Sequence, residues 1–403
     1  MEEIYLVAAV WLGLAVFSTI LSSHLRISMA LMEICVGIVA ALVAQKFFGM
    51  EMPGRDLPWL KFIAGSGAVL LTFLSGAELD PTVLRMKWKE VIVVGTVGFF
   101  APFLGCAAIA HYILGWNHQA SLLAGVALST TSMAVVYAVM LEYGFNKTEF
   151  GKGILGACFI NDLGTVIALG LIFAPFTVRT VIFIVVSVVA FAIMPFVTRK
   201  LTKVYGNKTA AIRTKWILGL LFGLGGLALW AGSEAVLPAY IAGMVLAGTM
   251  SNDHHYVRRL RTLTIGFLTP FYFIRAGAFV SIPALIVAPL TFFVLLGGKV
   301  LSKIFGLYPV IGKFRGHRKE RWYYTLLMST GLTFGTISAL YGLSHGIVTE
   351  EQYSLLVAVV IGSALIPTII ANAAFLPKHL LLPPPPLGEE EEILELETPE
   401  SAN

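Results

Sequence analysis

Long apolar stretches recur along almost the whole chain and restrict its fold more than any other feature. They run to about 20 residues each, enough for an α-helix to cross a hydrocarbon core of about 30 Å. Only 13% of the 403 residues are charged, and the mean hydropathy is +0.84. Because backbone polar groups in lipid must bond within their own segment, these stretches predict an all-α membrane protein.

Thirteen spans are expected, and the charged loops orient them. Their approximate ranges are 4–22, 28–48, 60–79, 90–114, 120–142, 152–174, 178–198, 212–231, 234–250, 261–280, 284–306, 322–345 and 353–376. Most of the 28 basic residues, including those from Lys303 to Arg321, fall at one set of span ends. Basic loops stay in the cytoplasm, so we expect the N-terminus outside and the C-terminus inside the cell (inner) membrane. The segment 377–403 is rich in proline and glutamate and predicts a cytoplasmic tail.

One carboxylate interrupts a strongly apolar span. Asp162, preceded by Asn161, lies near the middle of the segment 153–172. A charge at this depth is costly and marks ion or proton paths. Carboxylate, threonine and backbone oxygens suit Na⁺ or K⁺, and the same carboxylate can hold a proton instead. We therefore expect Asp162 to bind a cation and a proton in turn. The alternative is a structural aspartate paired with a lysine or an arginine.

Two spans carry polar runs near their centres. One holds Thr130, Thr131 and Ser132, and the other holds Thr330 and Gly331. They are the fifth and twelfth spans, so they should cross the membrane in opposite directions, as in the inverted repeats of secondary transporters. Interrupted helices in matching positions point to a binding site at the midplane. The alternative is that these small residues only allow close helix packing.

Further charges lie within spans or at their ends. Lys299 is expected to be a partner of the ion site, a structural counter-charge or a residue that reaches the membrane edge. Arg275 cannot usefully lose its proton, so we expect a fixed counter-ion. Glu33, Glu78 and Asp80 lie near cytoplasmic span ends and either line a negative funnel for cations or pair with nearby basic residues.

Several of these motifs together resemble a known family. Thr130-Thr131-Ser132 ahead of Asn161-Asp162, with Gly298-Lys299 later in the chain, is similar to the monovalent cation/proton antiporters of bacteria and archaea. The chain looks like the variant of this family that carries an Asn-Asp motif. The resemblance covers residues 4–376 and implies the sodium/proton antiporter fold, with 13 transmembrane helices, an inverted repeat and two crossing discontinuous helices.

The resemblance also implies an architecture and a mechanism. Residues 1–376 would form the transporter domain. Its scaffold and dimer helices would lie at about 4–79 and 212–280, its core helices at about 90–174 and 284–376, and a linker helix at about 178–198. The core would move like an elevator in a homodimer. Asp162 matches the essential ion-binding acid. Lys299 matches a lysine that, in some members, pairs with the first acid of an Asp-Asp motif. In this chain Asn161 replaces that acid, and members with an Asn-Asp motif are mostly electroneutral.

The expected function is exchange of Na⁺ or K⁺ for H⁺, with Asp162 as the only metal ligand that we name and no cofactor. Expected partners are the cation, the proton, the lipid bilayer and a second copy of the chain, with no nucleic acid. A sodium-coupled organic anion transporter of the same fold, or a cation channel or sensor, remains the alternative. The chain lacks His-Glu-x-x-His and Gly-x-Ser-x-Gly motifs, so we do not expect an enzyme.

Overall fold

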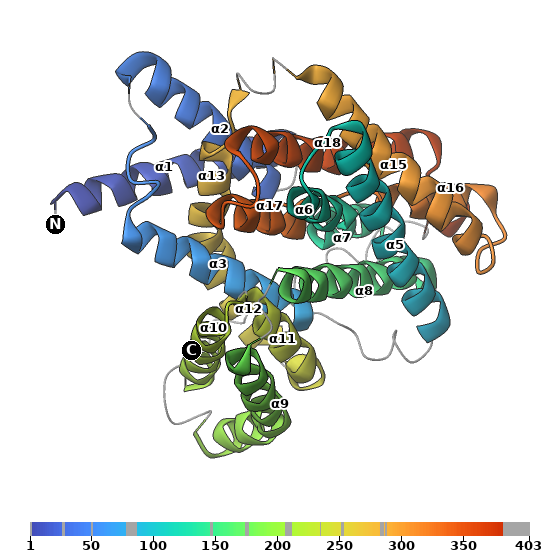
Figure 1. Ribbon diagram of the computed structural model, residues 1–403. Helices are drawn as coiled ribbons and strands as arrows, with labels where there is room; N and C mark the ends of the chain where they lie inside the picture. The colour runs from blue at the N-terminus through green and yellow to red at the C-terminus, as the bar shows by residue number, and fades with distance from the viewer. Residues whose placement is uncertain are drawn as a thin grey trace, which may run out of the picture.

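Helices make up all the regular structure in the described part of the chain. The computed structural model describes residues 2–25, 29–49, 51–77, 87–145, 148–173, 177–205, 212–233, 235–250, 254–282, 286 and 288–381. Figure 1 shows these helices in a bundle, with α1 and α2 at one edge. Glu78, Asp80 and the expected tail from residue 382 onward lie outside the described residues. The all-α fold class is therefore confirmed.

Each expected span coincides with one helix or with a closely spaced group of helices. The single helices are α1 (Glu2–Leu25), α2 (Met29–Phe48), α3 (Pro58–Ala77), α8 (Glu149–Ile172), α9 (Val178–Tyr205), α10 (Ile212–Trp230), α11 (Val236–Met250), α15 (Pro289–Ile311) and α18 (Glu350–Ala374). The composite ones are α5 (Trp88–Ala108) with η1 (Ile109–Ile113), α6 (His118–Ser129) with α7 (Met133–Glu142), α12 (His254–Leu263) with η3 (Thr264–Leu268) and α13 (Thr269–Ala278), and α16 (Arg318–Leu327) with α17 (Thr333–Ser344). A short 3₁₀ turn, η4 (Lys378–Leu380), follows α18. Nine described helices are each long and apolar enough to cross a membrane, and the count of thirteen crossings stays a prediction.

The helices pack in two groups. In one group α3 packs on α11, and α2 packs on α13. In the other, α5 contacts α6, α8 and α15, while α18 contacts α15, α16 and α17. In the first group, the helix backbones approach each other most closely at glycine residues. A side chain at Gly76 or Gly243 would collide with the backbone of the facing helix, and the same holds for Gly277 against α2. Small residues at such crossings let the backbones meet and gain packing energy in lipid.

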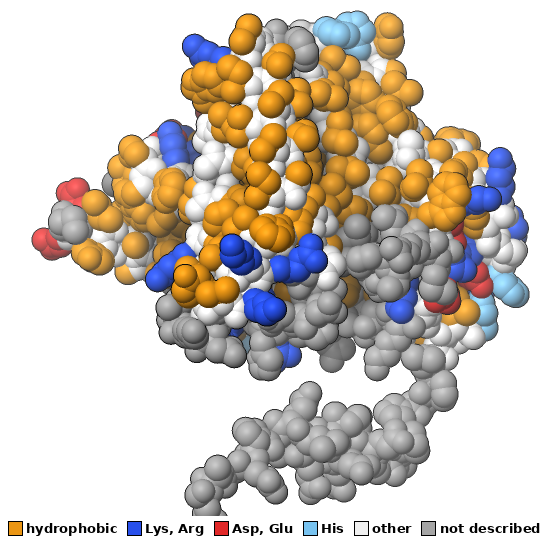
Figure 2. Space-filling view, turned by 90° about the horizontal axis from the view of Figure 1, so that it is seen from below, with side chains coloured by type: hydrophobic (Ala, Val, Ile, Leu, Met, Phe, Trp, Pro, Cys, Tyr) orange, Lys and Arg blue, Asp and Glu red, His pale blue; other side chains and the backbone are white. Residues whose placement is uncertain are grey.

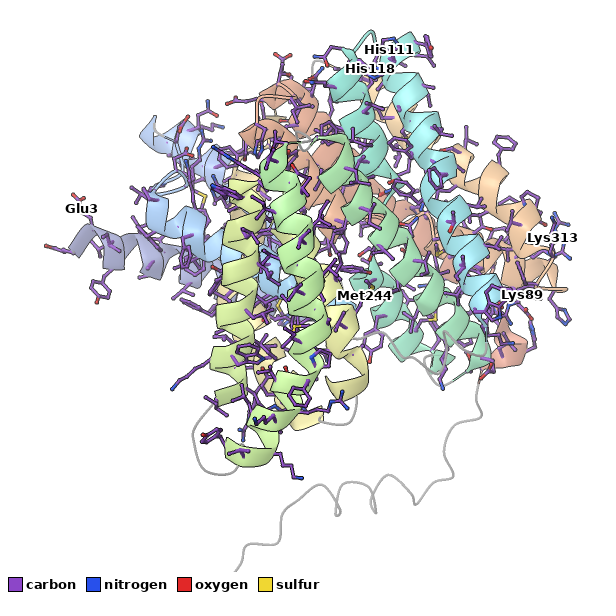
Figure 3. All side chains as sticks on the ribbon, turned by 60° about the horizontal axis from the view of Figure 1, so that its bottom comes forward. Glu3, Lys89, His111, His118, Met244 and Lys313 are labelled. Carbon is purple, nitrogen blue, oxygen red and sulfur yellow. The ribbon has the colours of Figure 1, made fainter. Side chains whose placement is uncertain are left out.

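Charged residues and apolar surface are segregated along the bundle. Figure 2 shows hydrophobic side chains over much of the visible face, with a group of lysines and arginines across its lower part and others at the left and right sides. In Figure 3, Lys89 and Lys313 lie at one end of the bundle, whereas His111 and His118 lie at the opposite end. Lys89 and Lys313 therefore lie at the same end, as the sequence predicts for these two residues. Which end faces the cytoplasm stays a prediction.

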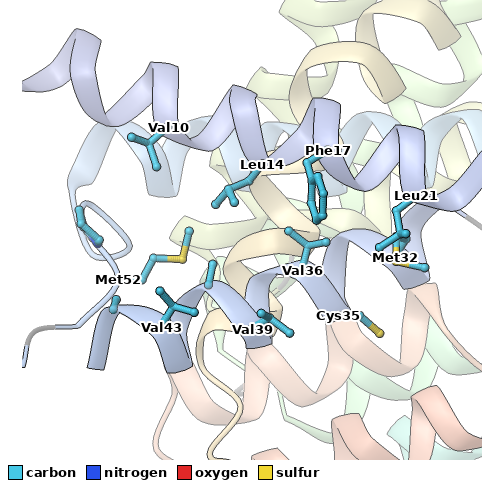
Figure 4. Close-up of a pocket in the computed structure, with 13 residues that line it drawn as sticks. Val10, Leu14, Phe17, Leu21, Met32, Cys35, Val36, Val39, Val43 and Met52 are labelled. Atoms are coloured by element: carbon cyan, nitrogen blue, oxygen red, sulfur yellow. The ribbon is translucent and has the colours of Figure 1, made fainter. Parts of the chain in front are cut away.

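An apolar groove of about 700 Å³ lies between α1 and α2 (Figure 4). Val10, Leu14 and Phe17 on α1 face Val36 and Val39 on α2. Only about a sixth of the apolar window of α1, 17%, is buried within the chain. This helix therefore depends on lipid or on another protein surface to cover its side chains.

Candidate ion-binding site

Two interrupted helices meet in the middle of the second group. Residues 130–132 separate α6 from α7, and residues 328–332 separate α16 from α17. The breaks touch directly. The Thr131 hydroxyl donates to the Met328 carbonyl at 2.9 Å, and the Ser132 backbone N–H donates to the Thr330 hydroxyl at 3.3 Å. The predicted pair of discontinuous, crossing helices is thus confirmed, with Thr330 and Gly331 in the second break.

Hydroxyl side chains explain why the helices stop here. Thr130 donates to the Ala127 carbonyl at 3.1 Å, and Thr330 donates to the Leu327 carbonyl at 2.7 Å. These hydroxyls bond to carbonyls in the last turns of the two helices, and the Leu327 carbonyl also accepts from the Thr330 backbone N–H at 3.2 Å. Thr130 has an extended backbone, with φ −61° and ψ 154°. At the start of α7, the Ser132 hydroxyl accepts from the Val135 N–H at 3.3 Å. Four half-helix ends, with their partial charges, therefore converge on one point.

Helix α8 brings the Asn-Asp pair beside this crossing. Asn161 and Asp162 are buried, with 0% and 1% exposure. The Asn161 amide donates to the carbonyl of Ser129, the last residue of α6, at 3.3 Å. Asn161 Oδ1 and Asp162 Oδ1 have no hydrogen-bond partner among the described residues. Buried acceptors are rarely left without a partner, so two such oxygens next to a helix break mark a place for a proton or a cation.

Two lysines of α15 enter the same region. Lys303 Nζ donates to the Thr131 hydroxyl at 3.0 Å, and Lys303 also interacts electrostatically with Asp162. Lys299 Nζ lies against Gly331 and has no hydrogen-bond partner among the described residues. Both lysines are 0% exposed. Among the described residues, two lysine side chains and one aspartate side chain are therefore buried at the crossing.

The sequence-based prediction placed Lys303 at the cytoplasmic end of the span 284–306, and the structure places it deeper in a longer helix. Helix α15 runs to Ile311, so Lys303 lies inside it, one turn after Lys299. The four-residue spacing puts both lysines on one helix face, and that spacing was the signal available in the sequence. It was overlooked because a span was expected to end at residue 306, close to a cluster of basic residues.

Arg275 lies away from this crossing, near the end of α13. Its Nε donates to the Arg55 carbonyl at 2.7 Å, and its guanidinium lies 3.8 Å from the Asp56 carboxylate. Burial acts to raise the pKa of Asp56, but hydrogen bonds from Lys61 and Arg55 outweigh it and hold that pKa below its usual range. The counter-ion of Arg275 is thus a loop aspartate, and Arg275 is not paired with Asp162.

The predicted cytoplasmic funnel has one described member, Glu33. It lies in the second turn of α2 and is 1% exposed, with no partner for Oε1 among the described residues. Glu33 is thus buried on a helix that packs on α13. Its expected role, either in a funnel or in a pair with a basic residue, stays a prediction.

Tyr240 joins the two helix groups next to the site. Its hydroxyl donates from α11 to the Phe159 carbonyl of α8 at 2.9 Å, and its ring stacks on Phe159 with centroids 5.3 Å apart. Phe159 precedes Asp162 by three residues, so this contact lies within one turn of the carboxylate. The sequence offered only a weak signal, a tyrosine in a small-residue run.

Comparison with known proteins finds relatives that are described as antiporters or as a potassium-efflux system protein. A probable Na(+)/H(+) antiporter 3 of Methanocaldococcus jannaschii is 28% identical over 230 residues, 54% of this chain and 58% of that protein. A Na(+)/H(+) antiporter of Enterococcus hirae is 24% identical over 357 residues, 82% of this chain and 91% of that protein. The glutathione-regulated potassium-efflux system protein KefC of Shigella flexneri is 24% identical over 380 residues, 90% of this chain and 59% of that protein.

The fold has a match among solved structures. The sodium proton antiporter MjNhaP1 of M. jannaschii superposes with a TM-score of 0.68 at 17% identity, covering 94% of this chain and 99% of that one. The sodium/proton antiporter fold is therefore confirmed. Residues 12–375 match the family described as sodium/hydrogen exchanger, transmembrane. The chain is thus a member of the sodium/hydrogen exchanger family and, with it, of the monovalent cation/proton antiporters.

Proposed function

We propose that the chain exchanges a monovalent cation for protons by binding each in turn at Asp162. One observation carries the proposal: a buried carboxylate with an unpartnered oxygen lies where two interrupted helices cross. Asn161 Oδ1 supplies a second free oxygen beside it. Thr130, Thr131 and Ser132 form the break between α6 and α7, where hydroxyls and unwound backbone carbonyls would complete the ion's ligands.

The charge balance supports one proton per cation. If both lysines keep their protons through the cycle, replacing H⁺ on Asp162 by Na⁺ or K⁺ moves no net charge. After one ligand has left and before the other has bound, Asp162 carries a negative charge. The positive charge of Lys303 would stabilise that charge through their electrostatic interaction. Exchange would be electroneutral, so an imposed membrane voltage alone would drive no net exchange.

Alternating access would come from movement of one helix group against the other. We propose that residues 90–174 and 284–376 form the moving core, that 4–79 and 212–280 form the scaffold, and that 178–198 links them. The Tyr240 contact with α8 crosses this boundary and would break or slide as the core moves. The scaffold would form a homodimer in the cell membrane, with the exposed face of α1 at the contact. Cross-linking through a cysteine at Phe17 tests this arrangement.

Proton uptake into everted membrane vesicles tests the central role of Asp162. Adding Na⁺ or K⁺ should collapse a preformed proton gradient in wild type and leave it intact in Asp162→Asn. Asp56→Asn is a matched control, because Asp56 lies in a loop and is about half exposed. Exchange that survives in Asp162→Asn, with normal protein levels, would refute the proposal.

The choice of cation needs the same assay with Na⁺, K⁺ and Li⁺ in parallel. Relatives are described both as Na(+)/H(+) antiporters and as a potassium-efflux system, so both ions are candidates here. A second function, sodium-coupled transport of an organic anion, is favoured by one observation, the presence of two buried lysines against one carboxylate. Uptake of labelled carboxylates that depends on Na⁺ and on Lys299 would identify that function.

A further inference from the structure

Two histidines and a glutamate meet at the basic end of the bundle, away from the ion site. His317 is the residue before α16, Glu320 lies in its first turn, and His379 lies in the η4 turn after α18. The ligand atoms of the three side chains all lie within 4.8 Å of one another. His379 Nε2 is 2.8 Å from Glu320 Oε1, and the two imidazole centroids are 4.7 Å apart. His379 is 59 positions from Glu320 in sequence, so the sequence shows no spacing motif for the whole cluster.

The local packing holds this cluster in place. Glu320 is 7% exposed, so its carboxylate is held in one position. Behind it, α16 packs on α18. Trp322 stacks on Phe375 with centroids 5.4 Å apart, and the Tyr323 hydroxyl donates to the Asn372 side chain at 3.2 Å. Sites on rigid, supported elements lose little ordering entropy when a ligand binds.

Imidazole nitrogen and carboxylate oxygen in this ratio form a three-ligand set for a divalent transition metal. Zn²⁺ binds two histidines and one glutamate with bonds of about 2.0–2.2 Å and takes water as its fourth ligand. Tetrahedral bonds of that length separate ligand atoms by about 3.3–3.5 Å. The ligand atoms lie within 4.8 Å of one another, and both histidine side chains are exposed, so they have room to rotate toward these separations when a metal binds.

The surrounding charge decides which metal fits. Each residue of the cluster has a basic neighbour in sequence: Arg318 follows His317, Lys319 precedes Glu320, and Lys378 precedes His379. The N-terminus of α16 adds partial positive charge. These groups oppose any ion held by charge alone, so Mg²⁺ and Ca²⁺ are excluded. A metal that forms strong bonds to imidazole nitrogen, such as Zn²⁺, can overcome that opposition.

We propose that His317, Glu320 and His379 form a binding site for Zn²⁺ or a similar transition metal, which clamps the turn after α18 to the start of α16. This site is separate from the proposed transport function, and it stands or falls independently of Asp162. Bound metal restrains the end of the chain against the helix that leads into the second break.

Metal titration of the full chain, purified without a histidine tag and stripped with chelator, tests the site. Calorimetry with Zn²⁺ should give one site per chain, and Zn²⁺ should raise the thermal unfolding midpoint. Mg²⁺ should do neither. His379→Ala and His317→Ala should each weaken Zn²⁺ binding roughly tenfold or more and abolish the thermal shift. His24→Ala, an exposed histidine at the end of α1, serves as the control and should bind as wild type.

Three results would overturn the proposal. They are the absence of Zn²⁺ binding by wild type, equal binding by wild type and both cluster variants, and a wild-type response to Mg²⁺ as large as that to Zn²⁺. Because both variants alter exposed side chains, they should elute as wild type does in size-exclusion chromatography, which separates a lost ligand from a misfolded protein.

Discussion

Replacing Gly331 by alanine places a methyl group where Lys299 and Thr130 now meet. The new Cβ would collide with Lys299 Nζ and approach the Thr130 hydroxyl to 2.9 Å. Lys299 can move its flexible end, but it is 0% exposed, so any new position must also bury the ammonium group. Overpacking of this kind costs about 1–3 kcal/mol. That is roughly 5- to 150-fold in the population of the conformation in which the site is assembled.

A double-mutant cycle measures whether Lys299 is the cause. Lys299→Met shortens the side chain by one atom and removes the colliding ammonium. The unfolding free energy is measured in detergent for both single variants and for the double variant Gly331→Ala with Lys299→Met. The double variant should lose less than the sum of the two single losses, by about 0.5 kcal/mol or more. Gly297→Ala on α15 is the matched control, because its Cβ would meet no atom within 4 Å. Vesicle exchange should fall with Gly331→Ala and persist with Gly297→Ala. Additive effects of Gly331→Ala and Lys299→Met would refute the reasoning.

Three other substitutions test separate contacts. Lys303→Met removes a charged donor to Thr131, a bond of about 1.5–3 kcal/mol, so vesicle exchange should fall roughly tenfold or more, and an unchanged rate would contradict this role. Glu90, in the first turn of α5, accepts hydrogen bonds from the Arg315 guanidinium at 2.9 and 3.0 Å. Glu90→Gln leaves the little-exposed Arg315 without its anion, so the unfolding free energy should fall by about 3–5 kcal/mol, and a wild-type unfolding midpoint would argue against a structural pair. Asp56 has a lowered pKa in the folded state, so its stabilising effect is present above the unfolded pKa of about 3.9 and is lost as pH falls through the folded value. Asp56→Asn should therefore lower stability at pH about 7 and flatten the acid limb of the stability curve, and parallel curves for variant and wild type would contradict the pairing.

The sequence alone was enough to predict the fold class and the position of the candidate ion site. Apolar stretches of membrane length leave only helices as a solution, because lipid offers no partner for an open backbone. The two helix breaks could also be predicted, because hydroxyl side chains in the middle of a span compete for helical hydrogen bonds and glycine weakens a helix. Asp162 could be predicted as a site residue because a carboxylate within an apolar span is energetically costly and usually has a functional role.

Only the tertiary structure decided which charges meet. Lys303 reaches Thr131 across 172 positions of sequence, and Arg275 reaches the Arg55 carbonyl across 220. Such pairs depend on which helices are neighbours and on how each is rotated about its axis. The apolar spans carry almost no amphipathic signal to fix that rotation, because lipid and protein interior are equally apolar. Hydropathy and helix-breaking residues are local properties and can be read along the chain, whereas contacts between distant helices exist only once the helices have packed.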